Sequence, residues 1–198
     1  MLGDALGLVE LGSLARGYRA LDALTKRSPV TVLEANLVEP GKFLLLFSGG
    51  VAEVEEAMSA ALAVADGALI DQLLLPFAHA ALLPALAGHV QVGSPDTLGV
   101  VEGRTPAATL LAADRALKDA DVRLCGLRVS PGLGGRGVFV IAGVQHDVEA
   151  GLAAATAQLN ARGAFFAAEL IPRPSDELVA LVLRPAPFNL SPNLLRGA

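Results

Sequence analysis

The chain has 198 residues, of which 53% are hydrophobic and 18% are charged, and its net charge is −5 at pH 7. This length suits one domain of ordinary size or two small ones. Dispersed lysines and arginines, a single tyrosine and no tryptophan argue against a nucleic-acid-binding surface. The chain has no uninterrupted run of 18 apolar residues, so the sequence predicts no membrane span.

The N-terminal residues and the cysteine content indicate a compartment. Residues 1–4 lack the basic region and the long apolar stretch that open a secretion signal. Cys125, the single cysteine, can form no internal disulfide, which suits a reducing environment. We therefore expect a cytoplasmic protein.

Along the first half of the chain, apolar periodicity predicts strands and helices in a definite order. Residues 6–11 form a short apolar run, and Ser13 then stands at the start of a helical stretch as an N-cap. Extended runs follow over residues 30–38 and 42–50, joined by a turn at Pro40-Gly41. A helix over 51–66 stops at Gly67, and a strand over 68–76 precedes a short helical tail. Helical spacing places Leu14, Tyr18, Leu21 and Leu24 on one face of the first helix, which we expect to be buried.

The second half repeats the first. Residues 5–32 align with residues 97–124 at a shift of 92, with nine identical positions. These identities include Glu10 with Glu102, Asp22 with Asp114, and Lys26 with Lys118. The shift grows to 94, placing Gly41-Lys42 over Gly135-Arg136, and then to 96, placing Pro76 over Pro172. Such self-similarity is typical of a tandem duplication.

The element order within each copy defines the expected fold. It is β-α-β-β-α-β, the ferredoxin-like motif, so we predict an α+β protein of two tandem ferredoxin-like domains in unpermuted order. We expect the first domain to span residues 1–93 and the second residues 94–198, with a linker near 89–96. The second domain includes a C-terminal tail that begins as a helix at Asp176 and becomes rich in Pro and Asn.

A glycine motif in the second copy invites a different interpretation. Residues 132–137 match the dinucleotide fingerprint G-x-G-x-x-G, which requires a loop that follows a strand and opens a helix. Here a strand-like segment, VFVIAG, follows the motif, and the matching segment of the first copy is a strand-to-strand turn. We therefore predict a tight turn between two strands and no cofactor.

The same landmarks carry a resemblance to a known family. Leu-Gly-Leu-Val-Glu, Asp-x-x-x-Lys, Gly-Lys-Phe, Gly-Val-x-x-Val-Glu and Pro-Arg-Pro occur in order between about residues 5 and 178. This arrangement resembles the bacterial microcompartment shell domain, and the tandem form is similar to the trimeric shell proteins. Among these it resembles the shell trimers of propanediol-utilisation microcompartments that carry an iron–sulfur cluster.

The resemblance implies how the chain would work. Three chains would form a pseudohexameric tile that packs edge to edge with other shell proteins, hexamers and pentamers, around encapsulated enzymes. The strand-to-strand turns would line a central pore that admits small metabolites. The pore-lining residues would be Val38, Glu39, Pro40 and Gly41 in the first copy and Gly132, Leu133, Gly134 and Gly135 in the second. The tile-edge contacts would be Lys26, Lys118 and Arg173.

Two departures from the family pattern affect these expectations. The cluster-bearing relative has a cysteine where this chain has Glu39, and Cys125 falls in a predicted strand, so no thiolate for an iron–sulfur cluster is expected at the pore. The first copy reads Pro76-Phe77-Ala78-His79 where the family often has Pro-Arg-Pro-His. Half of the tile edges would therefore lack the arginine.

Each implied role has an alternative that the sequence leaves open. Glu39 is either one member of an anionic pore ring, which would favour cations within a Debye length of about 10 Å, or a solvated loop residue. A ring of three carboxylates would also suit Ca²⁺ or Mg²⁺, although we assign no metal site. Lys26 and Lys118 are either edge residues or partners of Asp22 and Asp114 in helical i,i+4 pairs.

No constellation of residues predicts catalysis. The three histidines, His79, His89 and His146, lack metal-ligand spacing, and no serine lies in a G-x-S-x-G context. We expect a structural shell tile with neither enzymatic activity nor cofactor. The alternatives are a regulatory small-molecule-binding module, because paired ferredoxin-like domains also build ligand sensors, and an electron-transfer tile with a metal centre.

Overall fold

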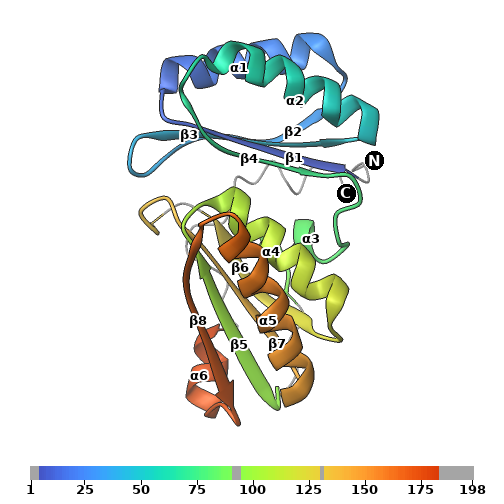
Figure 1. The fold of residues 1–198 in the computed structure, drawn as a ribbon, viewed down its shortest axis with the longest axis vertical. Helices are drawn as coiled ribbons and strands as arrows, with labels where there is room; N and C mark the ends of the chain where they lie inside the picture. The colour runs from blue at the N-terminus through green and yellow to red at the C-terminus, as the bar shows by residue number, and fades with distance from the viewer. Residues whose placement is uncertain (1–4, 91–94, 130–131, 183–198) are drawn as a thin grey trace. The chain divides into compact units, whose positions relative to one another are not determined.

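The computed structural model describes residues 5–90, 95–129 and 132–182, which form two compact units that meet in the chain between Ala78 and His79. Each unit is a four-stranded antiparallel sheet with two long helices on one face (Figure 1). The predicted α+β class and the duplicated β-α-β-β-α-β order are therefore confirmed. The expected domain boundary at 93/94 lies in residues 91–94, outside the described residues, and stays a prediction.

The first unit runs through six elements. They are β1 (Ala5–Leu11), α1 (Leu14–Arg27), β2 (Thr31–Val38), β3 (Lys42–Gly49), α2 (Val51–Ala65) and β4 (Leu69–Leu75). Their strands lie in the order β2-β3-β1-β4. The first strand is thus central, and the turn between β2 and β3 projects from one end of the sheet.

The second unit repeats this plan with one helix added at each end. Its elements are α3 (Leu82–Leu86), β5 (Thr97–Gly103), α4 (Pro106–Asp119), β6 (Arg123–Val129), β7 (Gly137–Gly143), α5 (Gln145–Ala161), β8 (Phe165–Pro172) and α6 (Asp176–Val182). The strand order β6-β7-β5-β8 matches that of the first unit. The predicted extended tail, residues 183–198, lies outside the described residues.

The duplication extends to irregularities of the two sheets. The pairing register of β2 with β3 shifts between Val32 and Glu34, and that of β6 with β7 shifts between Leu124 and Gly126. Since the skipped positions are 92 apart, both copies carry a β-bulge at the same place. Bulges are retained structural features of a strand pair, so the two units share local geometry as well as topology.

The helix-facing side of the first sheet forms a buried core. Side chains of β1 and β3 pack there against α1 and α2, among them Val9, Leu11, Phe43, Leu45, Phe47, Ala20, Leu24, Val54, Ala57 and Ala61. Each fully buried Leu, Val or Phe side chain contributes about 1.5–3 kcal/mol to folding. This apolar layer holds both helices on the sheet and fixes the direction of the β2–β3 turn.

The start of each first helix follows the local prediction. The Ser13 hydroxyl accepts a hydrogen bond from Arg16 N–H (3.4 Å), and the Thr105 hydroxyl accepts one from Ala108 N–H (3.2 Å). At the start of α2 the Glu53 carboxylate accepts from Gly50 N–H (2.8 Å). These bonds satisfy N–H groups that have no partner within a helix.

The buried face of α1 differs from the one predicted. Leu24 is buried, but Leu14 is 39% exposed and Tyr18 is 60% exposed, and the helix instead rests on Gly17 and Ala20. Without a side chain, Gly17 lets the helix approach Phe43, whose ring lies 5.0 Å from that of Tyr18, centroid to centroid. The close approach turns the outer face of α1, including Tyr18, toward solvent.

The two units reach this helix–strand contact with opposite residue sizes. In the first unit a glycine on the helix, Gly17, meets a large residue on the strand, Phe43. At the matched positions of the second unit the helix carries Thr109 and the strand carries Gly137, and a Cβ on Gly137 would lie 2.6 Å from the Thr109 Oγ1. In each unit one side of the helix–strand contact is a glycine and the other is a larger residue, but the two units place the glycine on opposite sides. A closely packed core accepts either arrangement when the space between helix and strand is filled.

Candidate functional site

The turn between β2 and β3 is short and tightly bonded. Gly41 N–H donates to the Val38 carbonyl (3.0 Å), and Gly41 has a φ of +88°, a conformation that favours glycine. Val38 is buried, whereas Glu39, Pro40 and Gly41 are exposed. The predicted turn at Pro40-Gly41 is confirmed, and its geometry holds the Glu39 carboxylate at the outer end of the hairpin.

The matching turn between β6 and β7 is richer in glycine. Gly132, Gly134 and Gly135 have φ values of +74°, +59° and +79°, and Arg136 N–H donates to the Leu133 carbonyl (3.2 Å). The motif leads into β7, a strand, and opens no helix. The prediction of a strand-to-strand turn is confirmed, and the motif lacks the setting that a dinucleotide fingerprint requires.

Behind each turn lies an ion pair at matched positions. Lys42 Nζ is 3.3 Å from Glu10 Oε2, and Arg136 Nη1 is 3.1 Å from Glu102 Oε2. The first pair is buried, with the Glu10 side chain 1% exposed, whereas the second is half exposed. The sequence alignment paired these four positions, but the carboxylate–cation contact was not predicted. It links the turn to the central strand of each sheet.

The second unit adds positive charge beside its turn. The Arg136 and Arg104 guanidinium groups lie 4.3 Å and 5.4 Å from the centroid of the Phe166 ring. Cations over an aromatic face are attracted by the ring quadrupole. Arg104 is exposed and pairs with no carboxylate among the described residues. At the matched positions the first unit has Gly12 and Ile70, so the surroundings of the two turns differ in charge.

The predicted edge lysines both form i,i+4 ion pairs. Lys26 Nζ is 2.7 Å from Asp22 Oδ2, and Lys118 Nζ is 2.6 Å from Asp114 Oδ2. The first pair is exposed, whereas in the second the Asp114 side chain is covered and the Lys118 side chain is exposed. The structure therefore shows the helical pairs that were the alternative to an edge role, and the edge role of both lysines stays a prediction.

Arg173 lies in the segment that leaves β8. Its φ is +47°, its N–H donates to the Asp96 carbonyl (2.8 Å), and the residue is exposed. Phe77, which occupies the matched position after β4, is also exposed. The absence of an arginine there follows from the sequence, and an apolar ring takes its place.

Cys125 occupies the bulge of β6 and is buried. It packs with Leu98 and Ala142 in a small apolar cluster, and burial raises the pKa of its thiol. The prediction of a cysteine inside a strand, acting as a small core residue, is confirmed. A protonated, enclosed thiol is a poor metal ligand and a poor nucleophile.

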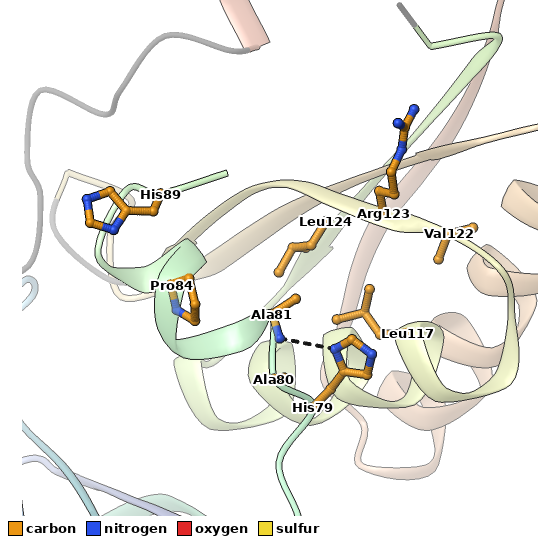
Figure 2. A pocket seen from close by; sticks show the side chains of 9 residues that line it. All are labelled: His79, Ala80, Ala81, Pro84, His89, Leu117, Val122, Arg123 and Leu124. Atoms are coloured by element: carbon orange, nitrogen blue, oxygen red, sulfur yellow. Dashed lines mark hydrogen bonds between the residues drawn. The ribbon is translucent and has the colours of Figure 1, made fainter. Parts of the chain in front are cut away.

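A half-open pocket of about 400 Å³ lies between α3, α4 and β6. Figure 2 shows Leu117 beside the His79 ring, Val122 and Leu124 farther along the pocket lining, and the Arg123 guanidinium directed away from the ring. His79 Nδ1 accepts from Ala81 N–H (3.2 Å). His89 lies at the far side, so the polar groups of the pocket do not converge on one point.

Residues 5–90, 95–129 and 132–182 contain no group of three His, Cys, Asp or Glu side chains placed to hold a metal ion. Nor does any helix within those ranges have the length and apolarity needed to cross a bilayer.

Comparison with known proteins identifies the class that this duplicated fold defines. The BMC domain model matches residues 5–78 and again residues 97–174. The chain therefore belongs to the BMC-domain family of bacterial microcompartment shell proteins and carries the domain twice. The expected family membership and the expected function as a shell protein are confirmed.

Similar proteins support this assignment. The chain is 36% identical to the bacterial microcompartment shell protein PduT of Citrobacter freundii over 177 residues, which covers 89% of this chain and 96% of that protein. A microcompartment protein from Desulfitobacterium hafniense DCB superimposes with a TM-score of 0.80 at 34% identity, covering 88% of this chain and 97% of the other. The fused permuted hexameric shell protein MSM0275 of the RMM microcompartment shares the fold, with a TM-score of 0.58 at 23% identity over 79% and 81% of the two chains.

Proposed function

We propose that three copies of this chain form a pseudohexagonal tile of a microcompartment shell with a pore on its threefold axis. One observation carries the proposal: each chain contains two sheets with the same strand order, the same bulge and a turn at the same end. Three chains therefore supply six similar domains, and six similar domains arranged around one axis form a tile with pseudo-sixfold symmetry.

The stoichiometry and the tiling are tested separately. Sedimentation velocity of the purified chain should give the mass of a trimer, and electron microscopy at higher concentration should show sheets, tubes or closed shells. A compact oligomer that binds a metabolite and never forms sheets would favour the regulatory alternative, which the family comparisons do not support. A monomer at micromolar concentration would refute the tile.

The β2–β3 and β6–β7 turns are the proposed pore lining, at Val38 to Gly41 and Gly132 to Gly135. Glu39 is exposed at the end of its hairpin, while the nearby Lys42 is paired with Glu10. The carboxylates of three Glu39 residues would then dominate the charge of three of the six turns, favouring cations and opposing anions within a Debye length of about 10 Å.

The test of the pore compares Glu39→Gln with the parent chain in reconstituted shells. Anionic metabolites should cross the Glu39→Gln shell faster, and a neutral metabolite of the same size should cross both at one rate. Arg104→Gln is the converse probe, because it removes a positive charge beside the other turn, and it should slow anions. Equal anion flux through the parent and Glu39→Gln shells would refute the pore role of Glu39.

The edge of the tile is proposed at Lys26, Lys118 and Arg173. Lys26 is the cleaner probe, because its pair with Asp22 is exposed and exposed pairs contribute little to stability. Lys26→Ala should leave the oligomer intact and reduce sheet formation in microscopy. Loss of the oligomer itself would contradict an edge role and would place Lys26 at a contact within the tile.

The remaining expectations belong to the same proposal. We infer a cytoplasmic shell that contains hexamers and pentamers of other shell proteins and encloses enzymes, while this chain catalyses no reaction and holds no cofactor. Its two domains are expected to divide at 93/94. Colourless, iron-free protein after anaerobic purification supports this view, and a stoichiometric iron content would favour an electron-transfer tile.

A further inference from the structure

The segment that follows β4 contacts α4 through a hydrogen bond to one carboxylate, that of Asp114. His79 N–H donates to Asp114 Oδ1 (2.8 Å), and Lys118 Nζ binds the other carboxylate oxygen, Oδ2. The Asp114 side chain is only 7% exposed. Beyond this bond the chain turns into α3, which packs on β6. Leu117 of α4 lies beside His79 in the same pocket (Figure 2).

The matched surface of α1 has the same acceptor but no segment on it. Asp22 aligns with Asp114, and its Oδ2 binds Lys26 as Asp114 binds Lys118. Its Oδ1 accepts from none of the residues that the structure describes, and the side chain is 61% exposed. Thr25, exposed, takes the place of the buried Leu117.

Tyr18 extends this open surface along α1. It is exposed, whereas Leu110 at the matched position of α4 is fully buried. A helix face that is covered in one copy of a duplicated domain and bare in the other indicates a missing partner, because exposed aromatic residues are enriched where proteins associate. We call the surface of Tyr18, Asp22 and Thr25 the α1 face.

The chain also contains a second docking segment. Because Pro172 aligns with Pro76, Ser175 takes the position of His79. Ser175 is exposed after β8, its Oγ accepts from Leu178 N–H (3.3 Å), and its own N–H meets no acceptor in the described part of the chain. The segment therefore has a donor available, and the α1 face has an acceptor available.

We propose that the α1 face of one chain binds the segment after β8 of a second copy, with the Asp22 carboxylate accepting the Ser175 N–H. The contact is heterologous: each chain gives its segment to one neighbour and receives a segment from the other, and such contacts close into a ring when the rotation between neighbours is one third of a turn. This inference rests on the proposed trimer and names the joint between its chains.

Disulfide trapping tests the joint directly. In a Cys125→Ala background, Asp22→Cys/Ser175→Cys should oxidise into covalent species of two and three chains on a non-reducing gel, and each single cysteine should give at most dimers. His79→Cys/Asp114→Cys is the matched control, because His79 N lies 2.8 Å from Asp114 Oδ1 within one chain. It should close within one chain and leave the monomer mass unchanged.

A charge reversal provides the second measurement. Asp22→Lys should raise the chain concentration for half-assembly roughly tenfold or more in sedimentation velocity, the loss expected for a charge-assisted hydrogen bond at each joint. Glu55→Lys, a reversal at an exposed position of α2, should leave that concentration unchanged.

The outcomes separate the joint from the tile. A parent chain that forms trimers, together with a cysteine pair that fails to cross-link or closes within one chain, overturns the proposed joint and leaves the tile standing. Equal effects of Asp22→Lys and Glu55→Lys also overturn the joint. A monomeric parent chain overturns both proposals. Cross-linked trimers together with weakened assembly of Asp22→Lys support both.

Discussion

Gly17 should be intolerant of the smallest side chain. In Gly17→Ala the new Cβ would overlap Phe43 Cγ and lie 2.5 Å from Phe43 Cβ. These atoms are close to the backbone of β3, so rotating the ring cannot relieve the overlap, and the helix or the strand must move. Overpacking costs about 3 kcal/mol at the upper end of its usual range, while alanine recovers about 1 kcal/mol of helix propensity.

The net expectation for Gly17→Ala is a loss of about 2 kcal/mol in the free energy of unfolding. Gly151, the glycine inside α5, is the matched control: its added Cβ would lie 2.9 Å from Ile141 Cδ1, the far end of a flexible side chain. Gly151→Ala should therefore be neutral or stabilising by up to about 1 kcal/mol.

Urea unfolding followed by circular dichroism measures both variants. Chain concentration must be held constant, because association of the folded state shifts the transition. The Gly17→Ala midpoint should fall and the Gly151→Ala midpoint should hold or rise, with unchanged slopes. A Gly17→Ala midpoint equal to that of the parent would refute the view that this glycine sets the distance between α1 and the sheet.

Three further substitutions probe the charges, the thiol and a helix start. Lys42→Met leaves the buried Glu10 carboxylate without its lysine and should lower the free energy of unfolding in urea by about 3 kcal/mol. Arg136→Met, in a half-exposed pair, should lower it by about 1 kcal/mol. Equal losses would contradict the role of burial. Because burial raises the pKa of Cys125, the unfolded thiol ionises first as pH rises. The free energy of unfolding should therefore fall above about pH 8.5, and Cys125→Ala should remove that slope. Thr105→Ala removes a side-chain cap and should cost about 1 kcal/mol; an unchanged urea midpoint would show that the cap is dispensable.

Features that depend on neighbouring residues in the chain were predictable from the sequence. Ser13 and Thr105 cap their helices as expected, because capping needs one side chain and N–H groups within three residues. Gly41 and Gly134 mark turns for a similar local reason, their positive φ. Alignment with the first copy then predicted the elements of the second copy. It also showed that the G-x-G-x-x-G motif connects two strands and is not a cofactor-binding loop.

Features that depend on what covers a residue were not predictable, and the repeat itself shows why. Asp22 and Asp114 occupy matched positions of the repeat, each four positions before a lysine. The Asp22 carboxylate is exposed, whereas the Asp114 carboxylate is covered and accepts a hydrogen bond from the segment that begins at His79. Periodicity treats them alike and therefore assigned Tyr18 to a buried face. In a duplicated chain, a mismatch of burial at identical positions reports the part of the assembly that a single copy lacks, and here it identifies α1 as the surface where a second chain is expected.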